Sequence, residues 1–590
     1  MKHGFHIPVL GLAFSVDTPL KVAKFGINSV VSIVDDELIE RMRLFYLEKN
    51  NIQGQPIQKK DGDYRAKRIT AYLNLLKQLV EADVRAMEDS AFLPGSDLNK
   101  YFDLLPHSSP DKKIYLEMSK MEPGKERDVL SHKLKSAIQA GDIDVNIMSK
   151  VDKINFDTKG VTLEDKHSDA LAALRGFAYS TLRSSVVLSA GMNPRLYQYI
   201  AELSAFLPND VGELEKKITL KVSDFRSAYI QAKYLVKKGI WVSEFRIESG
   251  LNCGGHAFAT DGYLLGPILE EFKQKRQELL QELSGIYKSA LLQKGYLQVP
   301  DFTIRFTVQG GIGTAQEQSF LLTYYGFDSV GWGSPFLLVP EATTVDDETL
   351  NHLIHSERED FYLSNASPLG VPFRNFKKST AEQERLERIR KGRPGSPCTK
   401  KYLISNTEFS ETPICTAARA YQHAKIKELE TQQLSVEAFR AAYHKITEKA
   451  CLCDGLAAAA YLKYGISKPK ESTAVAICPG PNTAFFQETY SLQQMVDHIY
   501  GRAPIALSDR PHFFINELQL YVDYLRNYIQ DIAQDDRKVK FAEKFKVQLL
   551  DGISYYRTLG KLFGKLNVFD LPAFLSGLTT CEEQLLKLQH

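Results

Sequence analysis

The sequence TIRFTVQGGIGTAQEQSFLLTYYGFDSVGWGS, residues 303–334, contains two consecutive strand-and-loop units. An apolar, β-branched run at 303–308 predicts a buried strand, and the glycine-rich loop behind it leads into a helical pattern at 315–325. A second short strand is expected at 329–331, with another glycine close behind it. Because parallel strands are joined by helices in this way, the stretch predicts the end of a parallel β/α sheet.

The same alternation extends back to the N-terminus. Six further apolar runs predict strands, at residues 7–12, 30–34, 144–148, 185–189, 218–222 and 241–247. Helical patterns separate several of them, at residues 195–203, 228–238 and 264–292. Eight strands in about 330 residues fit a (β/α)8 barrel, whereas an open doubly wound sheet usually has fewer strands. We therefore expect an α/β fold with a TIM barrel over residues 1–345.

Two regions depart from the barrel pattern. Residues 36–140 are too long for one βα unit and carry charged helical patterns at 64–87 and 125–140, so we expect a mostly helical insertion there. Beyond the barrel, Glu, Lys, Gln, Ala and Leu dominate, and residues 514–532 place apolar side chains on one helix face. This texture predicts a mainly α-helical C-terminal domain over residues 346–590.

The composition excludes several classes of protein. Of 590 residues, 44% are hydrophobic and 25% charged, which excludes a chain that is disordered over most of its length. The 74 basic and 72 acidic residues nearly cancel, so no overall field would bind nucleic acid or an anionic membrane. No export signal or membrane-spanning apolar run is visible. Seven cysteines are too few for a disulfide-stapled scaffold, and we expect a cytoplasmic protein.

Glycine-rich loops follow the last two predicted strands. Gly310, Gly311 and Gly313 lie between a strand and a helix, where glycines let backbone N–H groups approach a phosphate closely. Gly333 and Ser334 repeat this pattern after the last strand. The loops after the last two strands of a TIM barrel form its usual phosphate site, so we expect both loops to hold a phosphate. Two ordinary tight turns are the alternative.

A third glycine-rich loop carries a histidine. Gly254, Gly255 and His256 follow shortly after the predicted strand at 241–247. A histidine at the carboxyl end of a barrel strand lies where this fold places catalytic groups, and imidazole transfers protons near neutral pH. We expect His256 to be catalytic; a structural histidine is the alternative.

The order of these motifs resembles the nitronate monooxygenases, also called 2-nitropropane dioxygenases. These are FMN-dependent TIM barrels with an Ala-Gly-Gly-His element, a Gly-Gly-Ile/Tyr-Gly loop and a Val-Gly-Thr loop. The similar elements here are Cys253-Gly254-Gly255-His256, the loop 310–314, Gly333-Ser334, residues 8–13 with Thr18-Pro19, Val145-Asn146 and residues 191–194. The resemblance covers most of residues 1–345 in order, although the insertion interrupts it.

The resemblance implies an FMN-dependent oxidoreductase that oxidises a small carbanionic substrate with O2, with His256 as catalytic base or acid. It implies cofactor-binding roles for Ala13, Asn146, Gly254, Gly255, Gly310, Gly311, Gly313, Gly333 and Ser334. The Gly-Gly-His barrel pattern is also similar to flavin-dependent enoyl-acyl-carrier-protein reductases, so reduction of an enoyl thioester with NAD(P)H is an alternative. A barrel scaffold without turnover, which binds a partner through its C-terminal helices, is a third hypothesis. Asn252-Cys253 stands where Glu-Ala is usual, which leaves the substrate open.

Five cysteines lie in the predicted helical region: Cys398, Cys415, Cys451, Cys453 and Cys478. Four or five thiolates could bind zinc or an iron–sulfur cluster. Their spacing lacks the two-residue separation of common metal-binding knuckles, and free cysteines are readily buried. We expect reduced thiols and no metal. The segment 478–482, CPGPN, predicts a rigid turn.

Overall fold

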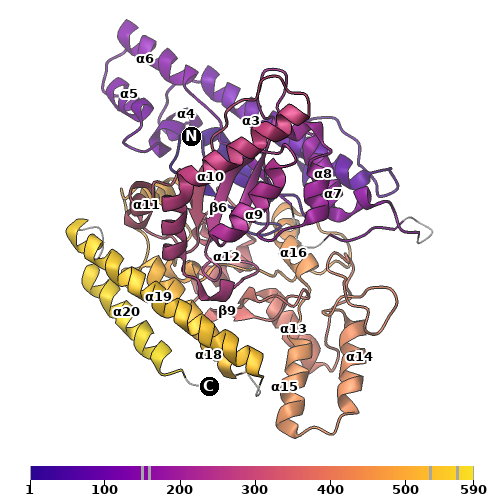
Figure 1. Cartoon of the computed structure of the whole chain (residues 1–590). Coiled ribbons are helices and arrows are strands. Elements are labelled where there is room, and N and C mark those ends of the chain that lie inside the picture. Colours follow the sequence, from indigo (N-terminus) through magenta and orange to yellow (C-terminus); the bar gives the residue numbers. More distant parts are fainter. Residues whose placement is uncertain (1, 148–151, 157–160, 531–534, 567–569, 589–590) are drawn as a thin grey trace.

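The computed structural model describes residues 2–147, 152–156, 161–530, 535–566 and 570–588. Within these residues, eight parallel strands close into a barrel in chain order, and the last strand pairs with the first. They are β1 (Phe5–Ile7), β2 (Asn28–Ser32), β3 (Ile143–Asn146), β4 (Ser184–Leu188), β5 (Lys216–Val222), β6 (Val242–Glu248), β7 (Arg305–Gln309) and β8 (Ser329–Gly331). The predicted α/β class and (β/α)8 barrel are confirmed (Figure 1).

The first predicted strand is misplaced. We expected it at residues 7–12, but β1 ends at Ile7 and residues 8–12 form a loop. Pro8 has no N–H group to donate to a neighbouring strand, and Gly11 has a φ of 130°, so the chain leaves the sheet here. The other strands lie within a few residues of their predicted positions, and Met148 lies outside the described residues.

Helices follow the barrel strands on the outside. They are α1 (Thr18–Val22), α7 (Asp169–Ala178), α8 (Pro194–Ile200), α9 (Phe225–Val236), α10 (Leu265–Gln293) and α11 (Ala315–Thr323). Side-chain caps set where some of them begin. Asp224 accepts the backbone N–H of Ser227 at 2.6 Å, and Thr314 accepts that of Glu317 at 3.2 Å. The cap at Thr314 makes α11 begin directly behind the glycine-rich loop after β7.

A helical insertion lies between β2 and β3. It contains α2 (Asp36–Lys49), α3 (Tyr64–Asp89), α4 (Asp97–Leu104), α5 (Pro110–Met118) and α6 (Lys125–Ser136). Figure 1 shows α5 and α6 at the end of the molecule away from the C-terminal helices. The insertion therefore leaves the strand order of the barrel unchanged.

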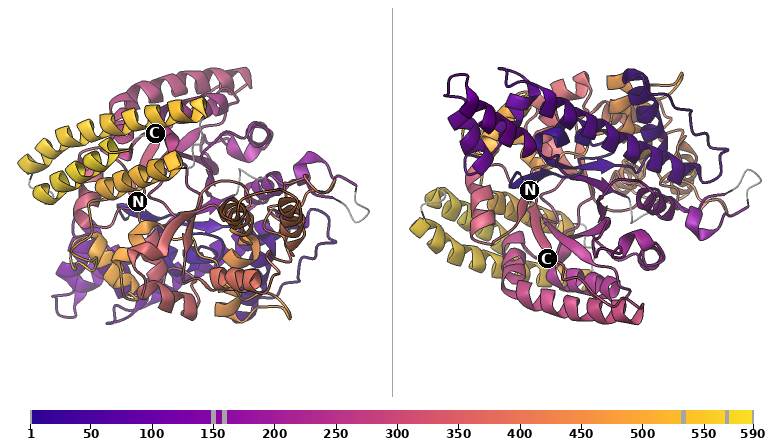
Figure 2. Two further views of the ribbon diagram at one scale, coloured as in Figure 1. Left: turned by 90° about the horizontal axis from the view of Figure 1, so that it is seen from below. Right: turned by 90° about the horizontal axis from the view of Figure 1, so that it is seen from above.

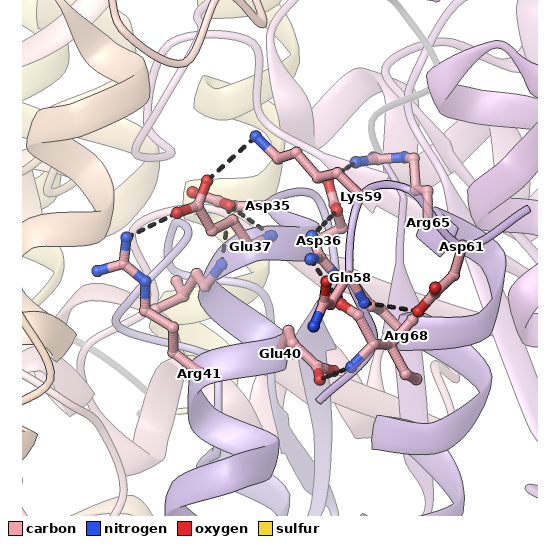
Figure 3. A network of polar contacts seen from close by, with 12 residues as sticks. Asp35, Asp36, Glu37, Glu40, Arg41, Gln58, Lys59, Asp61, Arg65 and Arg68 are labelled. Carbon is pink, nitrogen blue, oxygen red and sulfur yellow. Dashed lines mark hydrogen bonds and ion pairs between the residues drawn. The ribbon is translucent and has the colours of Figure 1, made fainter. Parts of the chain in front are cut away.

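A buried network of charges joins the insertion to the barrel (Figure 3). Asp36 is the first residue of α2, which follows β2. Its carboxylate accepts hydrogen bonds from the guanidinium groups of Arg65 at 2.7 Å and Arg68 at 2.8 Å. The preceding residue, Asp35, caps α2 and also forms an ion pair with Lys400 from the C-terminal region, at 2.5 Å. Buried ion pairs are strongly directional, and their rupture leaves an uncompensated charge. Arg65 also donates to the Val34 carbonyl behind β2 at 3.0 Å, so these contacts join α3 to α2, to the strand end and to the C-terminal region.

The residues after the barrel are mainly helical, with one two-stranded antiparallel sheet. The elements are α12 (Asp347–Ile354), β9 (Phe361–Ser364), β10 (Phe373–Phe376), α13 (Thr380–Arg390), α14 (Arg419–Glu430), α15 (Val436–Thr447), α16 (Leu452–Tyr464), α17 (Leu492–Ile499), α18 (Phe513–Gln530), α19 (Asp536–Leu566) and α20 (Leu571–Leu586). Helix α18 coincides with the predicted helix as far as residue 530, and residues 531–532 lie outside the described residues. In Figure 1, α14 and α15 project from the rest of the molecule.

Helices α18 and α19 pack against α10 of the barrel, and α20 packs on α18 and α19 (Figure 2, yellow beside pink). Phe514 of α18 stacks on Tyr556 of α19 at 4.7 Å between ring centroids, and Phe320 of α11 meets Phe563 of α19 edge-on at 4.9 Å. The buried apolar residues of barrel and C-terminal helices form one continuous cluster. The domain boundary at residue 345 stays a prediction. No helix among the described residues combines the length and apolarity needed to cross a bilayer.

Candidate active site

A cavity of about 970 Å³ lies at the carboxyl ends of the barrel strands. Loops after β1, β4, β5, β6, β7 and β8 line it, and segments from the C-terminal region complete its walls, among them residues 478–479, Tyr524 and Phe541. Ligand sites of TIM barrels lie at this end, and the volume is at the upper end of typical ligand pockets. The fold therefore places one large site where the sequence motifs meet.

All the predicted site residues except Ala13 and Gly313 line this cavity. The lining residues are Asn146, Gly254, Gly255, His256, Gly310, Gly311, Gly333 and Ser334. They come from β3 and from the loops after β6, β7 and β8. Closure of the barrel brings these loops together, although nearly 190 residues separate the first from the last.

The other two residues lie outside the cavity lining. Ala13 is fully buried, and its N–H donates to the carbonyl of Leu456 at 3.0 Å. Gly313 donates its N–H to the Glu317 carboxylate at 2.8 Å. A Cβ on Gly313 would lie 2.5 Å from Nε of Arg510, so close packing against this arginine explains the glycine. A cofactor contact of Ala13 or Gly313 has no support in this geometry.

The two loops after β7 and β8 contain backbone donors in residues that line the cavity. Among the described residues, the N–H groups of Gly311, Gly333 and Ser334 donate to no protein acceptor, and all three residues line the cavity. Gly310 and Gly311 have φ angles of 130° and 76°, a turn that bulkier residues rarely adopt. Unpaired backbone N–H groups in a concave turn bind anions. These residues therefore fit the phosphate of FMN.

A segment of the C-terminal region lies across the loops after β6, β7 and β8. The carbonyl of Cys478 accepts the N–H of Gly255 at 3.1 Å, and the N–H of Gly480 donates to the hydroxyl of Ser334 at 2.7 Å. A Cβ on Gly254 would lie 2.5 Å from that Cys478 carbonyl oxygen. The glycine at 254 thus allows the segment 478–482 to form part of the wall. Sequence reasoning identified only a rigid turn here.

His256 is held at the cavity wall by strand β10 and the loop before it. Its Nε2 and the hydroxyl of Ser367 are 2.7 Å apart, and its ring meets that of Phe373 edge-on at 5.0 Å. The backbones of His256 and Phe373 also form an antiparallel β-bridge. The ring therefore has one orientation at the cavity, as a proton-transfer group needs.

Polar residues that sequence reasoning missed form the cavity floor. Lys221 of β5 pairs with Glu248 of β6 at 3.0 Å, and Gln309 of β7 donates to the same carboxylate at 3.0 Å. Lys221 is the one lysine or arginine among the lining residues of the described chain. These side chains lie in strands that read as apolar runs. The sequence signal that could have identified them is a charged residue within or at the end of an apolar run.

A second polar layer lies below this floor. Arg246 is fully enclosed and contacts Asp144 at 3.0 Å and Glu244 at 2.8 Å. Burial raises the pKa of Asp144. Burial also acts to raise the pKa of Glu244, but the nearby cations Arg246 and Arg305 together lower it. TIM-barrel interiors usually hold branched apolar side chains. This barrel instead carries charge through its interior up to the cavity.

The cysteines of the C-terminal region lie near one another in two groups. Cys398 packs against Cys415, and their thiols form a hydrogen bond. Cys453 and Cys478 pack with Phe373, the residue that contacts His256. No set of three or more His, Cys, Asp or Glu residues in the described chain is arranged to hold a metal ion. The predicted state of reduced thiols stays a prediction.

The closed parallel barrel with a cavity at its carboxyl ends defines the TIM-barrel class. No family model and no curated protein matches the sequence. Solved structures with a distant likeness to this chain include the following two. The enoyl reductase domain of MlnA from the macrolactin biosynthesis cluster of Bacillus amyloliquefaciens has 14% identity and a TM-score of 0.32, over 67% of this chain and 86% of that chain. A point mutant of FabK from Thermotoga maritima has 13% identity and a TM-score of 0.28, over 68% of this chain and 81% of that chain. These scores are too low to carry an argument about function.

Proposed function

We propose that the protein is an FMN-dependent oxidoreductase with its active site in the barrel-mouth cavity. The observation that carries this proposal is that the N–H groups of Gly311, Gly333 and Ser334 donate to no acceptor among the described residues, and that these three residues line the same cavity as His256. Such donors favour a phosphate group. When bound, FMN supplies the redox chemistry, and the protein supplies binding, orientation and electrostatics.

The residues of the cavity have distinct roles in this proposal. The loops after β7 and β8 bind the phosphate through backbone donors. His256, oriented by Ser367 and Phe373, moves a proton to or from the substrate. Lys221 places a positive charge at the floor, where it stabilises negative charge that develops during the reaction.

Two reactions fit this site. The resemblance of the motifs favours oxidation of a small carbanionic substrate with O2. The cavity favours the second, reduction of an enoyl thioester with NAD(P)H, because it has room for more than FMN and a small substrate. Phe258, Tyr524 and Phe541 are among its lining residues, and their aromatic rings suit an apolar chain.

Flavin content tests the proposal first. Purified protein is expected to be yellow and to release FMN on denaturation. Gly333→Asp places a carboxylate near the unpaired donors without a clash, since a Cβ there meets nothing closer than 3.5 Å. We expect this variant to bind FMN at least about tenfold more weakly through charge repulsion. Gly285→Asp, on α10 with open space around its Cβ, is the matched control. Colourless protein that takes up no FMN would contradict the proposal and favour the scaffold hypothesis.

The substrate is tested separately on flavin-loaded protein. Consumption of NADPH that depends on an enoyl thioester selects the reductase. Oxygen uptake with a nitronate and no nicotinamide selects the monooxygenase. Flavin-loaded protein that is inactive in both assays would exclude both substrates and keep the cofactor assignment.

A further inference from the structure

The carboxyl group of Glu517, on α18, lies buried where three elements meet. Its side chain is 1% exposed. It accepts the hydroxyl of Ser249, which lines the cavity behind β6, and the backbone N–H of Leu265 at the start of α10, the latter at 2.9 Å. The hydroxyl of Tyr556 on α19 lies 3.4 Å away. One carboxyl group thus joins the C-terminal helices to the cavity wall.

Ser249 also contacts the loop that carries His256. Its hydroxyl oxygen accepts the N–H of Asn252 at 3.1 Å. The Asn252 side chain then donates to the Phe513 carbonyl on α18 at 3.2 Å. It also lies so close to Gly311 that a Cβ there would collide with it. Ser249 and Asn252 therefore fix the wall on both sides, toward α18 and toward the predicted phosphate donors.

No cation of the described chain offsets the buried charge of Glu517. None of the ion pairs among the described residues includes it, and the titratable groups that face it are Tyr521 of its own helix, Tyr556 of α19 and Cys253 of the β6 loop. From α10, the backbone N–H of Leu265 donates to the Glu517 carboxyl group. Burial accordingly raises the pKa of Glu517 to about 7, and its hydrogen bonds only partly oppose this shift.

We propose that Glu517 is a positioning residue that holds the cavity-wall loop 249–256 in place when it is protonated and releases this loop when it ionises. When Glu517 is protonated, the oxygen that accepts the Ser249 hydroxyl can donate to it instead, while the other oxygen continues to accept the Leu265 N–H. An ionised carboxylate in this enclosure gains by reaching water, which requires α18 and the loop to separate. The effect on FMN binding rests on the proposed function; the loop movement does not.

The direction of the pH dependence follows from the raised pKa. Glutamate has a pKa of roughly 4.3 when exposed, so the closed wall binds the proton more tightly than an open one. The stabilisation that Glu517 gives to the closed wall is fully present below the pKa of an exposed glutamate. It is lost as the pH rises through about 7, the pKa of Glu517 in the closed wall. Between about pH 6 and pH 8, linkage predicts a roughly tenfold rise in the population of the open wall.

Hydrogen–deuterium exchange of peptides that cover residues 249–264 tests this without any ligand. After correction for intrinsic rates, the native protein is expected to exchange here about tenfold faster at pH 8 than at pH 6. Glu517→Gln keeps a donor and an acceptor but cannot ionise, so its exchange should be slow at both pH values. Glu517→Leu should exchange fast at both. Glu543→Gln, at an exposed position on α19, is the matched control and should behave as the native protein.

FMN affinity of the same proteins gives the second measurement. Native protein should bind FMN more weakly at pH 8 than at pH 6, in proportion to the fraction of closed wall that is lost, and Glu517→Gln should lose no affinity. Equal pH dependence of exchange in the native protein and Glu517→Gln would overturn the proposal. If exchange follows the expected pattern but no variant binds FMN, the proposed function fails and the role of Glu517 stands. If Glu517→Leu does not fold, the comparison of native protein with Glu517→Gln still decides.

Discussion

The guanidinium of Arg510 forms a buried ion pair with the carboxylate of Glu317, at 2.8 Å. Arg510 precedes α18, and Glu317 lies in the first turn of α11. The same arginine donates to the Gly311 carbonyl at 2.5 Å, and the same glutamate accepts the Gly313 N–H. A residue of the C-terminal region thus fixes the glycine-rich loop after β7.

Replacement of Arg510 with Met should destabilise the protein by about 3–5 kcal/mol, because it leaves the buried Glu317 carboxylate without its cationic partner. Urea unfolding measures this loss. The double variant Arg510→Met/Glu317→Gln should lose less than the sum of the single variants. Additive losses would show that the two residues do not act as a pair.

His256→Ala should keep its flavin but lose about 10²- to 10⁴-fold in turnover, the usual contribution of a positioned proton-transfer group. Flavin content and rate are measured on the same sample. Ser367→Ala, which removes a hydroxyl that contacts the imidazole, should have a smaller effect. Full activity of His256→Ala would exclude His256 from the mechanism, and loss of flavin would assign it to cofactor positioning.

Gly254→Ala should displace the segment 478–482, because the added Cβ would lie 2.5 Å from the Cys478 carbonyl oxygen. We expect a loss of about 1–3 kcal/mol in unfolding free energy, together with weaker FMN binding. Gly333→Ala is the matched control in the same cavity, since its Cβ meets only ordinary contacts at 3.5 Å. Similar stability of the two variants would show that the segment adapts easily.

Cys398 should react with iodoacetamide already near neutral pH. The hydrogen bond from Cys415 lowers the pKa of Cys398 to about 7, although burial opposes this shift. The thiolate, which is the reactive form, therefore predominates above that pH. Peptide mapping of alkylation rates from about pH 6 to pH 9 gives the midpoint. Cys415→Ala should move the midpoint upward, and an unchanged midpoint would contradict the role of this hydrogen bond.

Elemental analysis of untagged protein is expected to find neither zinc nor iron in stoichiometric amount, in keeping with the cysteine spacing. One equivalent of zinc, or about four of iron with labile sulfide, would contradict this expectation. Loss of that metal in Cys451→Ser would then assign the site.

The barrel was predictable from sequence because its evidence is local. A strand buried on both faces must be apolar along its whole length, and a helix must repeat its apolar residues every three to four positions. Both patterns recur along the first 345 residues, which limits the topology. Local chemistry also explains the exception at β1, where Pro8 removes a backbone donor and ends the pairing.

The glycine-rich loops and His256 could likewise be found from sequence, because each follows its strand directly and strand ends of a parallel barrel share one face. The role of each glycine in these loops could not be predicted in the same way. Gly313 and Gly333 have the same place in the motif pattern, yet Gly313 packs against Arg510 and Gly333 faces the cavity. The difference depends on a residue almost 200 positions away.

Sequence alone thus determined the class of fold, the insertion and the glycine-rich loops at the cavity, since these depend on the order of local patterns. Only the tertiary structure decided what completes the site. Segment 478–482 forms a wall, and Glu517 and Arg510 hold the loops after β6 and β7. These residues act through contacts that span well over a hundred positions of sequence. Such contacts follow from how α18 and its neighbours pack on the barrel, which no local spacing specifies.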